Sequence, residues 1–257
     1  FVLFNTLSLN QFPLYKYFST EPIFFFSIHP QQKRNISFQI TNSLSLYIYI
    51  MISMTNIFTP IEEALEAYKN GEFLIVMDDE DRENEGDLIM AAELITQEKM
   101  AFLVRYSSGY VCVPLSEERA NQLELPPMLA NRSDRHGTAY TITCDFAEGT
   151  TTGISAHDRA LTTRSLANPN SKPQDFIKPG HILPLRAVPG LLKKRRGHTE
   201  AAVQLSTLAG LQPAGVICEL VRDEDGLMMR LDDCIRFGKK HGIKIININQ
   251  LVEYISK

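Results

Sequence analysis

VMDDEDRENEGDLIMAAE, residues 76–93, places seven carboxylates and one arginine in the ten positions from 78 to 87. An apolar run at 73–77 leads into this acidic stretch, and a second apolar run at 88–92 follows it. Short apolar runs of this kind predict buried strands. A dense acidic run is more typical of a solvated surface or a disordered tail. Because this one joins two core-like segments, it predicts a strand–loop–strand unit whose acidic loop lies over the end of a β-sheet.

The segments around this unit alternate between helical and strand patterns. Thr59 can cap a helix that has Pro60 at its first position, Glu62 completes a capping box, and Asn70-Gly71 ends it. The middle of the chain, 126–190, is rich in Pro, Thr and Gly and is expected to be mostly loop. This interleaving predicts one α+β domain over 54–257, with a mixed β-sheet covered by helices on both faces. The further helices expected are 96–107, 117–122, 198–209, 232–241 and 250–255, and the further strands are 109–114, 139–145, 215–221 and 243–246.

The composition of the 257 residues is that of a soluble globular protein, with 44% apolar residues and a net charge of −4. There is no overall basic field, so nucleic acid is not the expected partner. No run of 18 apolar residues is present, so no membrane span is expected. The four cysteines form no CxxC pair, which disfavours a zinc site or disulfides and favours a reducing compartment such as the cytoplasm. They are Cys112, Cys144, Cys218 and Cys234.

Residues 1–53 differ from the rest of the chain. Glu21 is their only acid, and they hold no periodic pattern for long. The acid-poor composition is compatible with a transit peptide. Transit peptides are rich in arginine, however, and residues 1–53 contain only Arg34. The chain begins with Phe1, while Met51 and Met54 are natural starts. We therefore expect residues 1–53 to be a disordered or non-native extension rather than a targeting segment.

The acidic loop can be tested against a calcium-binding EF-hand. Asp81, Glu83, Glu85 and Gly86 match positions 1, 3, 5 and 6 of that loop, but Ala92 stands where the final glutamate is needed. The segment before the loop also has the pattern of a strand, whereas an EF-hand needs a helix there. Crowded carboxylates repel one another unless a cation offsets them. Mg²⁺ takes only one or two carboxylates, which leaves others free for proton transfer. A solvated acidic loop remains the alternative.

A basic stretch, KKRRGHTE at 193–200, is the natural partner of the acidic loop. Four cations precede a glycine and a helix start, where backbone N–H groups and arginines favour an anion such as phosphate. His198 is placed to offer a neutral imidazole to a metal. The alternative for the four cations alone is a polybasic surface loop.

Three further stretches can contribute to a site. KPGHILPL, 178–185, predicts a rigid turn that carries His181, which is either functional or structural. GVICEL, 215–220, puts Glu219 on an apolar strand, where a buried carboxyl would suit acid–base chemistry and an edge-exposed one would not. GTTTGIS, 149–155, resembles a backbone cradle for an anion, but its spacing fits neither a P-loop nor a dinucleotide-binding turn.

Together, DDEDRENEGDLI, TTGISAHDR, KPGHILPL, RRGHTEAAVQL and GVICEL, in this order over about 57–255, resemble the 3,4-dihydroxy-2-butanone 4-phosphate synthase family. The resemblance implies a lyase of riboflavin biosynthesis. Its reaction converts D-ribulose 5-phosphate to L-3,4-dihydroxybutan-2-one 4-phosphate and formate, through an enediolate and a carbon-skeleton rearrangement. It also implies a homodimer with active sites near the interface. A fused second enzyme domain is not expected, so the form should be monofunctional.

The resemblance also implies residue roles. Mg²⁺ or Mn²⁺ would be bound by Glu83 and His198, and catalysis would depend on His181, Glu219 and Asp87. Two alternatives stay open: another metal-dependent sugar-phosphate enzyme, such as an isomerase or aldolase, and an acidic protein that only binds cations. The substrate contacts that the resemblance implies are Arg82, Glu83, Asp87, Arg195, Arg196, Gly197, His198, Thr199 and Glu219.

Overall fold

The computed structural model describes residues 57–131, 133 and 135–257, so the expectation for 1–53 lies outside the described residues. In this part of the chain one seven-stranded sheet has the order β4-β5-β3-β6-β2-β1-β7. β1 pairs antiparallel with β2 and parallel with β7, and β3 pairs parallel with β5 and antiparallel with β6. The sheet is therefore mixed, as predicted. The strands are β1 (Leu74–Met77), β2 (Gly86–Ala91), β3 (Cys112–Leu115), β4 (Cys144–Phe146), β5 (Phe176–Arg186), β6 (Gly215–Glu219) and β7 (Lys244–Asn247).

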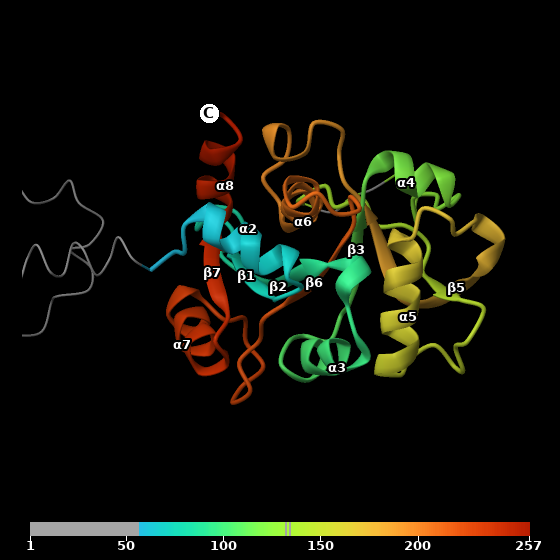
Figure 1. The fold of residues 1–257 in the computed structure, drawn as a ribbon, viewed down its shortest axis with the longest axis horizontal. Helices are drawn as coiled ribbons and strands as arrows, with labels where there is room; N and C mark the ends of the chain where they lie inside the picture. The colour runs from blue at the N-terminus through green and yellow to red at the C-terminus, as the bar shows by residue number, and fades with distance from the viewer. Residues whose placement is uncertain (1–56, 132, 134) are drawn as a thin grey trace, which may run out of the picture. The chain divides into compact units, whose positions relative to one another are not determined.

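Helices cover both faces of this sheet (Figure 1). α2, α6 and α8 pack on one face, and α3, α5 and α7 contribute to the core on the other. Each face has its own apolar core, so the sheet is buried on both sides, which confirms the predicted fold class. The helices are α2 (Ile61–Lys69), α3 (Gln97–Arg105), α4 (Glu117–Gln122), α5 (Ala156–Ala167), α6 (His198–Leu208), α7 (Leu231–His241) and α8 (Ile248–Tyr254).

Strand alternation decides which face holds the acidic side chains. Successive strand residues point to opposite faces, so Val76 and Ile89 pack on the α6 side while Ile75 packs on the other. Asp87 stands two residues before Ile89 on β2 and is the register partner of Glu219 on β6. Both carboxylates therefore lie on the face that α6 covers.

Two elements contradict the expectation that 126–190 is mostly loop. α5 escaped prediction because several of its buried residues are polar, Thr162, Thr163 and Ser165 among them, so it lacks an apolar stripe. β5 contains Pro179 and Pro184, which usually argue against a strand. The turn expected at 178–185 is thus part of β5. The strand expected at 139–145 is short: only its end joins β4, and Tyr140 and Thr141 form isolated bridges.

The start of α2 also differs from the prediction. Pro60 is the N-cap residue and extended, and no side chain caps the helix. Thr59 instead donates its backbone N–H to the Ile245 carbonyl of β7 over 2.7 Å, which ties it to the sheet. At α3 the prediction is confirmed, because the Thr96 side chain accepts from the Lys99 N–H.

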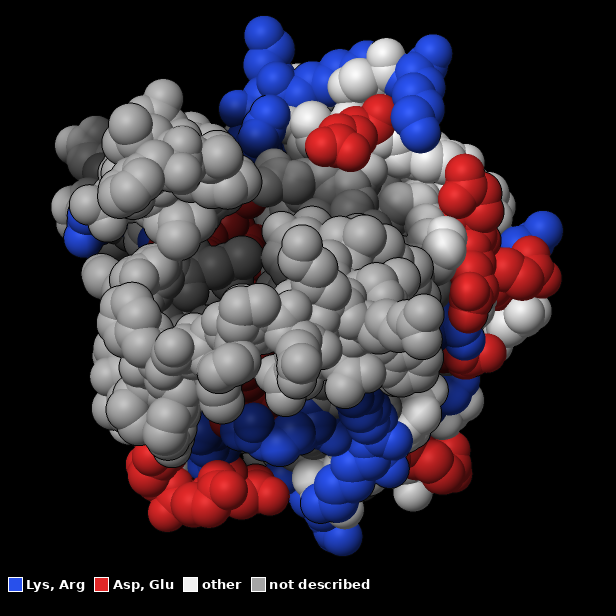
Figure 2. Space-filling model, turned by 90° about the vertical axis from the view of Figure 1, so that its left-hand side faces the viewer, with Lys and Arg blue, Asp and Glu red and all other residues white. Residues whose placement is uncertain are grey.

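The surface and the cysteines agree with the composition. None of the described helices combines the length and apolar character needed to cross a bilayer. Figure 2 looks onto the side where α7 and α8 lie; its described Lys and Arg side chains form groups beside separate groups of Asp and Glu. All four cysteines are buried and have free thiols.

Candidate active site

The acidic loop between β1 and β2 is organised around one buried carboxylate, that of Asp78. Its Oδ1 accepts the Glu85 N–H at 2.8 Å, and its Oδ2 accepts the Glu83 N–H at 3.2 Å and Arg82 Nη1 at 2.8 Å. These bonds fold the loop back on itself. The loop is therefore a built structure and not a freely solvated acidic run, and Asp78 is largely occupied with holding it.

His198 begins α6 and is buried against β1 and β2. Its Nε2 lies 3.0 Å from the Val76 carbonyl, which can only accept, so Nε2 carries the proton. Nδ1 then faces Glu83 Oε2 at 3.8 Å and Asp87 Oδ1 at 3.6 Å. Burial lowers the pKa of His198, but the nearby carboxylates, Asp87 and Glu83 above all, outweigh it and raise the pKa.

Asp87 and Glu219 stand next to each other across β2 and β6. Asp87 is buried, and its Oδ1 has no hydrogen-bond partner among the described residues. Burial raises the pKa of Asp87; His198 opposes this, while Glu219 and Glu83 add to it. Glu219, at the end of β6, is half-buried and its Oε2 accepts a 2.9 Å hydrogen bond from Ser108 Oγ. The pair thus combines a dry carboxyl with a partly solvated one.

The donor atoms suit a divalent cation. Oxygen and nitrogen ligands of Asp78, Glu83 and His198 lie within 4.8 Å of one another. Ligands about 2.1 Å from an octahedral ion stand roughly 3.0–4.2 Å apart. The 3.8 Å from His198 Nδ1 to Glu83 falls in that range and is too long for a hydrogen bond. Glu83 and His198 therefore fit the predicted metal pair, and the unpaired oxygen of Asp87 lies beside them.

Cationic side chains converge on the N-terminus of α6. A Cβ on Gly197 would lie 2.3 Å from Arg195 Nη1 and 3.1 Å from Arg82 Nη2, so only glycine lets both guanidinium groups come this close. Gly197 is also the N-cap residue, with no side-chain cap for the first N–H groups of the helix. Thr199 is buried in this first turn. The arrangement is suited to an anion.

The two arginines of the basic stretch, Arg195 and Arg196, are held by different partners. Arg195 is held inward by Glu200, by Thr138 Oγ1 at 2.9 Å and by the His136 carbonyl at 3.1 Å. Arg196 is exposed and donates to Asn249 Oδ1 at 3.1 Å. The structure therefore places Arg195 in the site and Arg196 outside its lining.

A small cavity of about 70 Å³ joins these groups. It brings together the predicted Arg82, Glu83, Asp87, Arg195, His198, Thr199 and Glu219, and it adds residues to which the sequence assigned no role in this site: Glu85, Cys112, Thr138, Tyr140, Leu185 and Ile217.

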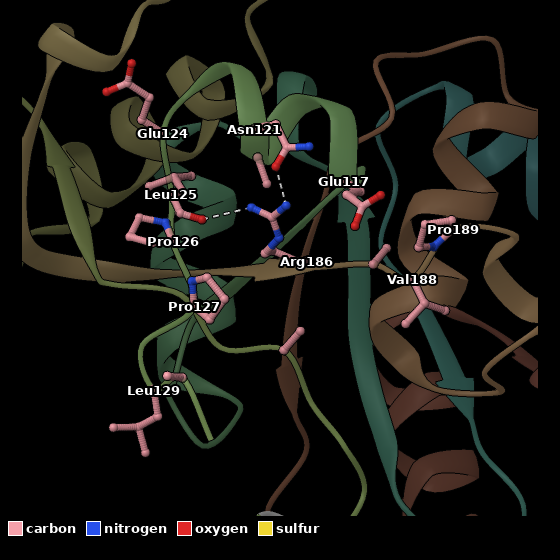
Figure 3. A pocket seen from close by; sticks show the side chains of 14 residues that line it. Glu117, Asn121, Glu124, Leu125, Pro126, Pro127, Leu129, Arg186, Val188 and Pro189 are labelled. Atoms are coloured by element: carbon pink, nitrogen blue, oxygen red, sulfur yellow. Dashed lines mark hydrogen bonds between the residues drawn. The ribbon is translucent and has the colours of Figure 1, made fainter. Parts of the chain in front are cut away.

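A larger cavity of about 720 Å³ lies elsewhere, between α4, the segment 125–130 and the end of β5 (Figure 3). Its Arg186 is tied to the Leu125 carbonyl and the Asn121 side chain. None of the predicted site residues lines it, so volume alone does not locate the chemistry.

His181 is the predicted catalytic residue that the structure keeps apart. It does not line the 70 Å³ cavity, and its side chain is 42% exposed. Its Nδ1 lies 2.7 Å from Asp145 Oδ2. His136, which the motifs did not favour, has its Nδ1 4.0 Å from Glu83 Oε1.

The stretch GTTTGIS is not an open cradle for a ligand. The N–H groups of Thr151 and Gly153 both donate to Asp158 Oδ2, at 3.1 and 3.0 Å, and the Thr151 hydroxyl donates to the same oxygen at 2.8 Å. The backbone donors that suggested an anion site are thus satisfied by the chain's own carboxylate.

Comparisons with known proteins identify the family of this chain. The family model for 3,4-dihydroxy-2-butanone 4-phosphate synthase matches residues 62–254. The synthase of Schizosaccharomyces pombe is 64% identical over 196 residues, which are 76% of this chain and 96% of that protein. A crystal structure of the Candida albicans synthase is 96% identical, with a TM-score of 0.75, and covers 79% of this chain and 100% of its own. A synthase solved with two magnesium ions is 47% identical, with a TM-score of 0.74, and covers 77% of this chain and 97% of its own. The chain therefore belongs to the 3,4-dihydroxy-2-butanone 4-phosphate synthase family, as its motifs predicted.

Proposed function

We propose that the chain converts D-ribulose 5-phosphate to L-3,4-dihydroxybutan-2-one 4-phosphate and formate. The observation that supports this most directly is the unpaired, buried oxygen of Asp87, which faces His198 Nδ1 beside Glu219 in a cavity that two arginines also line. Family membership supplies the substrate. The free, buried cysteines support a reducing compartment such as the cytoplasm.

Glu83 and His198 are the proposed ligands of a divalent cation, Mg²⁺ or Mn²⁺. The relative solved with two magnesium ions supports this choice, as do the donor distances. When bound, such a cation supplies Lewis-acid polarisation of carbonyl and hydroxyl oxygens. The Val76 carbonyl keeps the proton on Nε2 and so leaves the Nδ1 lone pair free for the ion.

The remaining site residues would contact different parts of the substrate. Arg82, Arg195, Thr199 and the first turn of α6 would hold the phosphate and fix the position of the sugar. Asp87, whose pKa is raised by burial, and the neighbouring Glu219 are the groups placed to take and return protons.

We also propose a homodimer in which His181 of one copy completes the site of the other. Within one chain His181 stands outside the cavity and is exposed. Ile177, four residues earlier on β5, is 56% exposed, and Ile154, beside the Gly153 that packs on His181, is 53% exposed. Exposed apolar side chains around a polar one are typical of a protein–protein contact.

The test is incubation of the purified chain with ribulose 5-phosphate and measurement of formate and of the four-carbon ketone phosphate. One formate for each ribulose 5-phosphate consumed is expected. Turnover to another pentose phosphate, or cleavage without formate, would instead identify an isomerase or an aldolase. Lack of both turnover and binding would point to a protein that only binds cations.

A further inference from the structure

His181 is held by one carboxylate at two points. Asp145 Oδ1 accepts the His181 backbone N–H at 2.8 Å, and Asp145 Oδ2 contacts the ring Nδ1 at 2.7 Å. Asp145 is buried, at 7% exposure, while the imidazole is 42% exposed. A buried carboxylate is thus aimed at the inner nitrogen of a ring whose outer part is accessible.

The strand pairing is irregular where the two residues meet. Cys144 pairs with Ile182, but Asp145 next pairs with Ile177, so residues 178–181 bulge out of β5. The Gly180 N–H in this bulge donates to Thr143 Oγ1 at 3.1 Å. Bulges of this kind redirect side chains and are frequent beside active sites.

Two glycines let the backbone close around the pair. A Cβ on Gly153, whose φ is +98°, would lie 2.1 Å from Asp145 Oδ2 and 2.4 Å from His181 Nδ1. A Cβ on Gly180 would lie 2.2 Å from the Cys144 carbonyl carbon and 2.7 Å from Asp145 Cγ. Gly153 is in turn fixed by its N–H bond to Asp158 at 3.0 Å. The Nδ1 side of the ring is therefore enclosed by fixed backbone.

This geometry determines which nitrogen of His181 is reactive. An ionised carboxylate can only accept, so Nδ1 carries the proton that Asp145 binds. The lone pair of the neutral ring then lies on Nε2, for which the structure gives no hydrogen bond to any described residue. Nε2 is thus oriented as a base, and its partner can stabilise the imidazolium that forms after proton uptake.

We propose that Asp145 is the positioning residue of His181: it fixes the Nδ1–H tautomer and presents Nε2 to substrate. The inference rests on the proposed function of His181 in proton transfer. In that step Nε2 takes a proton from the sugar, the Nδ1–H···Asp145 bond persists, and the proton is later returned from Nε2. Asp145 itself does not touch substrate.

Asp145→Asn tests the inference because it inverts the pattern of hydrogen bonding. The His181 backbone N–H requires an acceptor, so the amide oxygen stays there and the amide NH₂ faces ring Nδ1. This stabilises the Nε2–H tautomer, which has no lone pair on Nε2. We expect kcat for formate release to fall by about 10²–10⁴-fold, with a smaller change in KM. The matched control is Asp175→Asn, which alters a carboxylate that accepts the Lys172 N–H next to β5 and contacts none of the described histidines; it should retain activity.

Nitrogen-15 spectra of histidine-labelled protein give a readout besides activity, with His181 identified by its absence in His181→Ala. The wild-type chain should show Nδ1 protonated, and Asp145→Asn should show Nε2 protonated. In the His181→Ala background, Asp145→Asn should have no further effect on kcat. A wild-type ring protonated on Nε2 overturns the inference even if the variant does not fold. Full activity of Asp145→Asn beside an inactive His181→Ala overturns it as well. Full activity of His181→Ala instead contradicts the proposed function of His181, and the spectra then still decide whether Asp145 sets the tautomer.

Discussion

His198 and His181 both face carboxylates, but at different separations. His198 Nδ1 lies 3.6 Å from Asp87 and 3.8 Å from Glu83, whereas His181 Nδ1 lies 2.7 Å from Asp145. The first two distances are too long for hydrogen bonds and leave room for a cation, while the third is a short, direct hydrogen bond. In our proposal, the same residue types therefore give a metal ligand in one place and an oriented base in the other.

The two histidines differ in which ring nitrogen is held by a hydrogen bond to the protein. His198 gives its Nε2–H to the Val76 carbonyl, so Nδ1 faces the carboxylates. His181 gives its Nδ1–H to Asp145, so Nε2 faces outward. Burial follows the same division, because His198 is buried and the His181 side chain is exposed. The neighbour of each ring, more than the ring itself, thus defines its chemical role.

The largest effects should come from the proposed metal pair. Glu83→Gln or His198→Ala should reduce formate release by more than the roughly 100-fold that loss of an outer partner of a metal site costs. Calorimetric titration with Mg²⁺ should lose its binding signal in both variants. Glu80→Gln is the control, since Glu80 is an exposed acid of the same loop. Normal turnover by Glu83→Gln or His198→Ala would rule out the assignment.

Substitution of the two neighbouring arginines, Arg195 and Arg196, should have clearly different effects on KM. Arg195→Ala removes a guanidinium from the cavity and should raise KM by about 10–100-fold, the range of a hydrogen bond to a charged group. Arg196→Ala removes an exposed side chain and should change KM by less than about fivefold. Steady-state kinetics measure both changes. Thermal melts check that the Arg195→Ala variant stays folded after buried Glu200 loses its cationic partner. Equal effects would mean that the anion binds across the outer surface.

A smaller effect is expected at Glu219. Ser108→Ala removes the hydroxyl that donates to Glu219 Oε2 at 2.9 Å. The carboxylate stays in place but is less well oriented, so kcat should fall by about tenfold, equal to about 1.4 kcal/mol. A rate equal to that of the wild-type chain would show that this hydrogen bond does not orient Glu219 for catalysis.

Asp87 should influence stability through pH. Burial raises the pKa of Asp87 in the folded chain. Ionising this carboxyl therefore destabilises the folded chain, and the loss of stability grows as the pH rises above the unfolded-state pKa of about 3.9. Without metal, Asp87→Asn should therefore melt above the wild-type chain by several degrees at about pH 8 and by less at about pH 5. The same variant should lose formate release. A melting difference that shrinks as pH rises would contradict the raised pKa.

Much of the fold was accessible from sequence because apolar patterns mark both cores. α4, for example, was predicted with the observed bounds, Glu117–Gln122. α5 was not predicted because its buried residues include Thr162, Thr163 and Ser165. These polar side chains are buried but do not produce the apolar periodicity that marks a helix in sequence. β5 was missed since prolines and Gly180 interrupt a strand that tolerates them through a bulge.

The site was predictable where one short stretch supplies both the residue and its context. The charge pattern pointed to the acidic loop and to the basic stretch with His198, because charge next to apolar runs is unusual in sequence, while the roles of Glu83 and Asp87 came from the family resemblance. Ser108 and Asp145 were not, because each acts through a partner distant in sequence, Glu219 and His181 respectively. No local pattern records such pairs; the fold creates them, because it brings Glu219 on β6 beside the segment that precedes β3 and pairs β4 with β5.

The central claim is that the acidic loop and α6 form a cation-dependent site that releases formate. It is tested most directly by formate release from ribulose 5-phosphate by the wild-type chain and Glu83→Gln, before and after chelation and after Mg²⁺ or Mn²⁺ is restored. The account predicts that the chelator stops the wild-type reaction, that the cation restores it, and that Glu83→Gln stays inactive throughout. Formate release that persists in the chelator, or a Glu83→Gln variant as active as the wild-type chain, would contradict it.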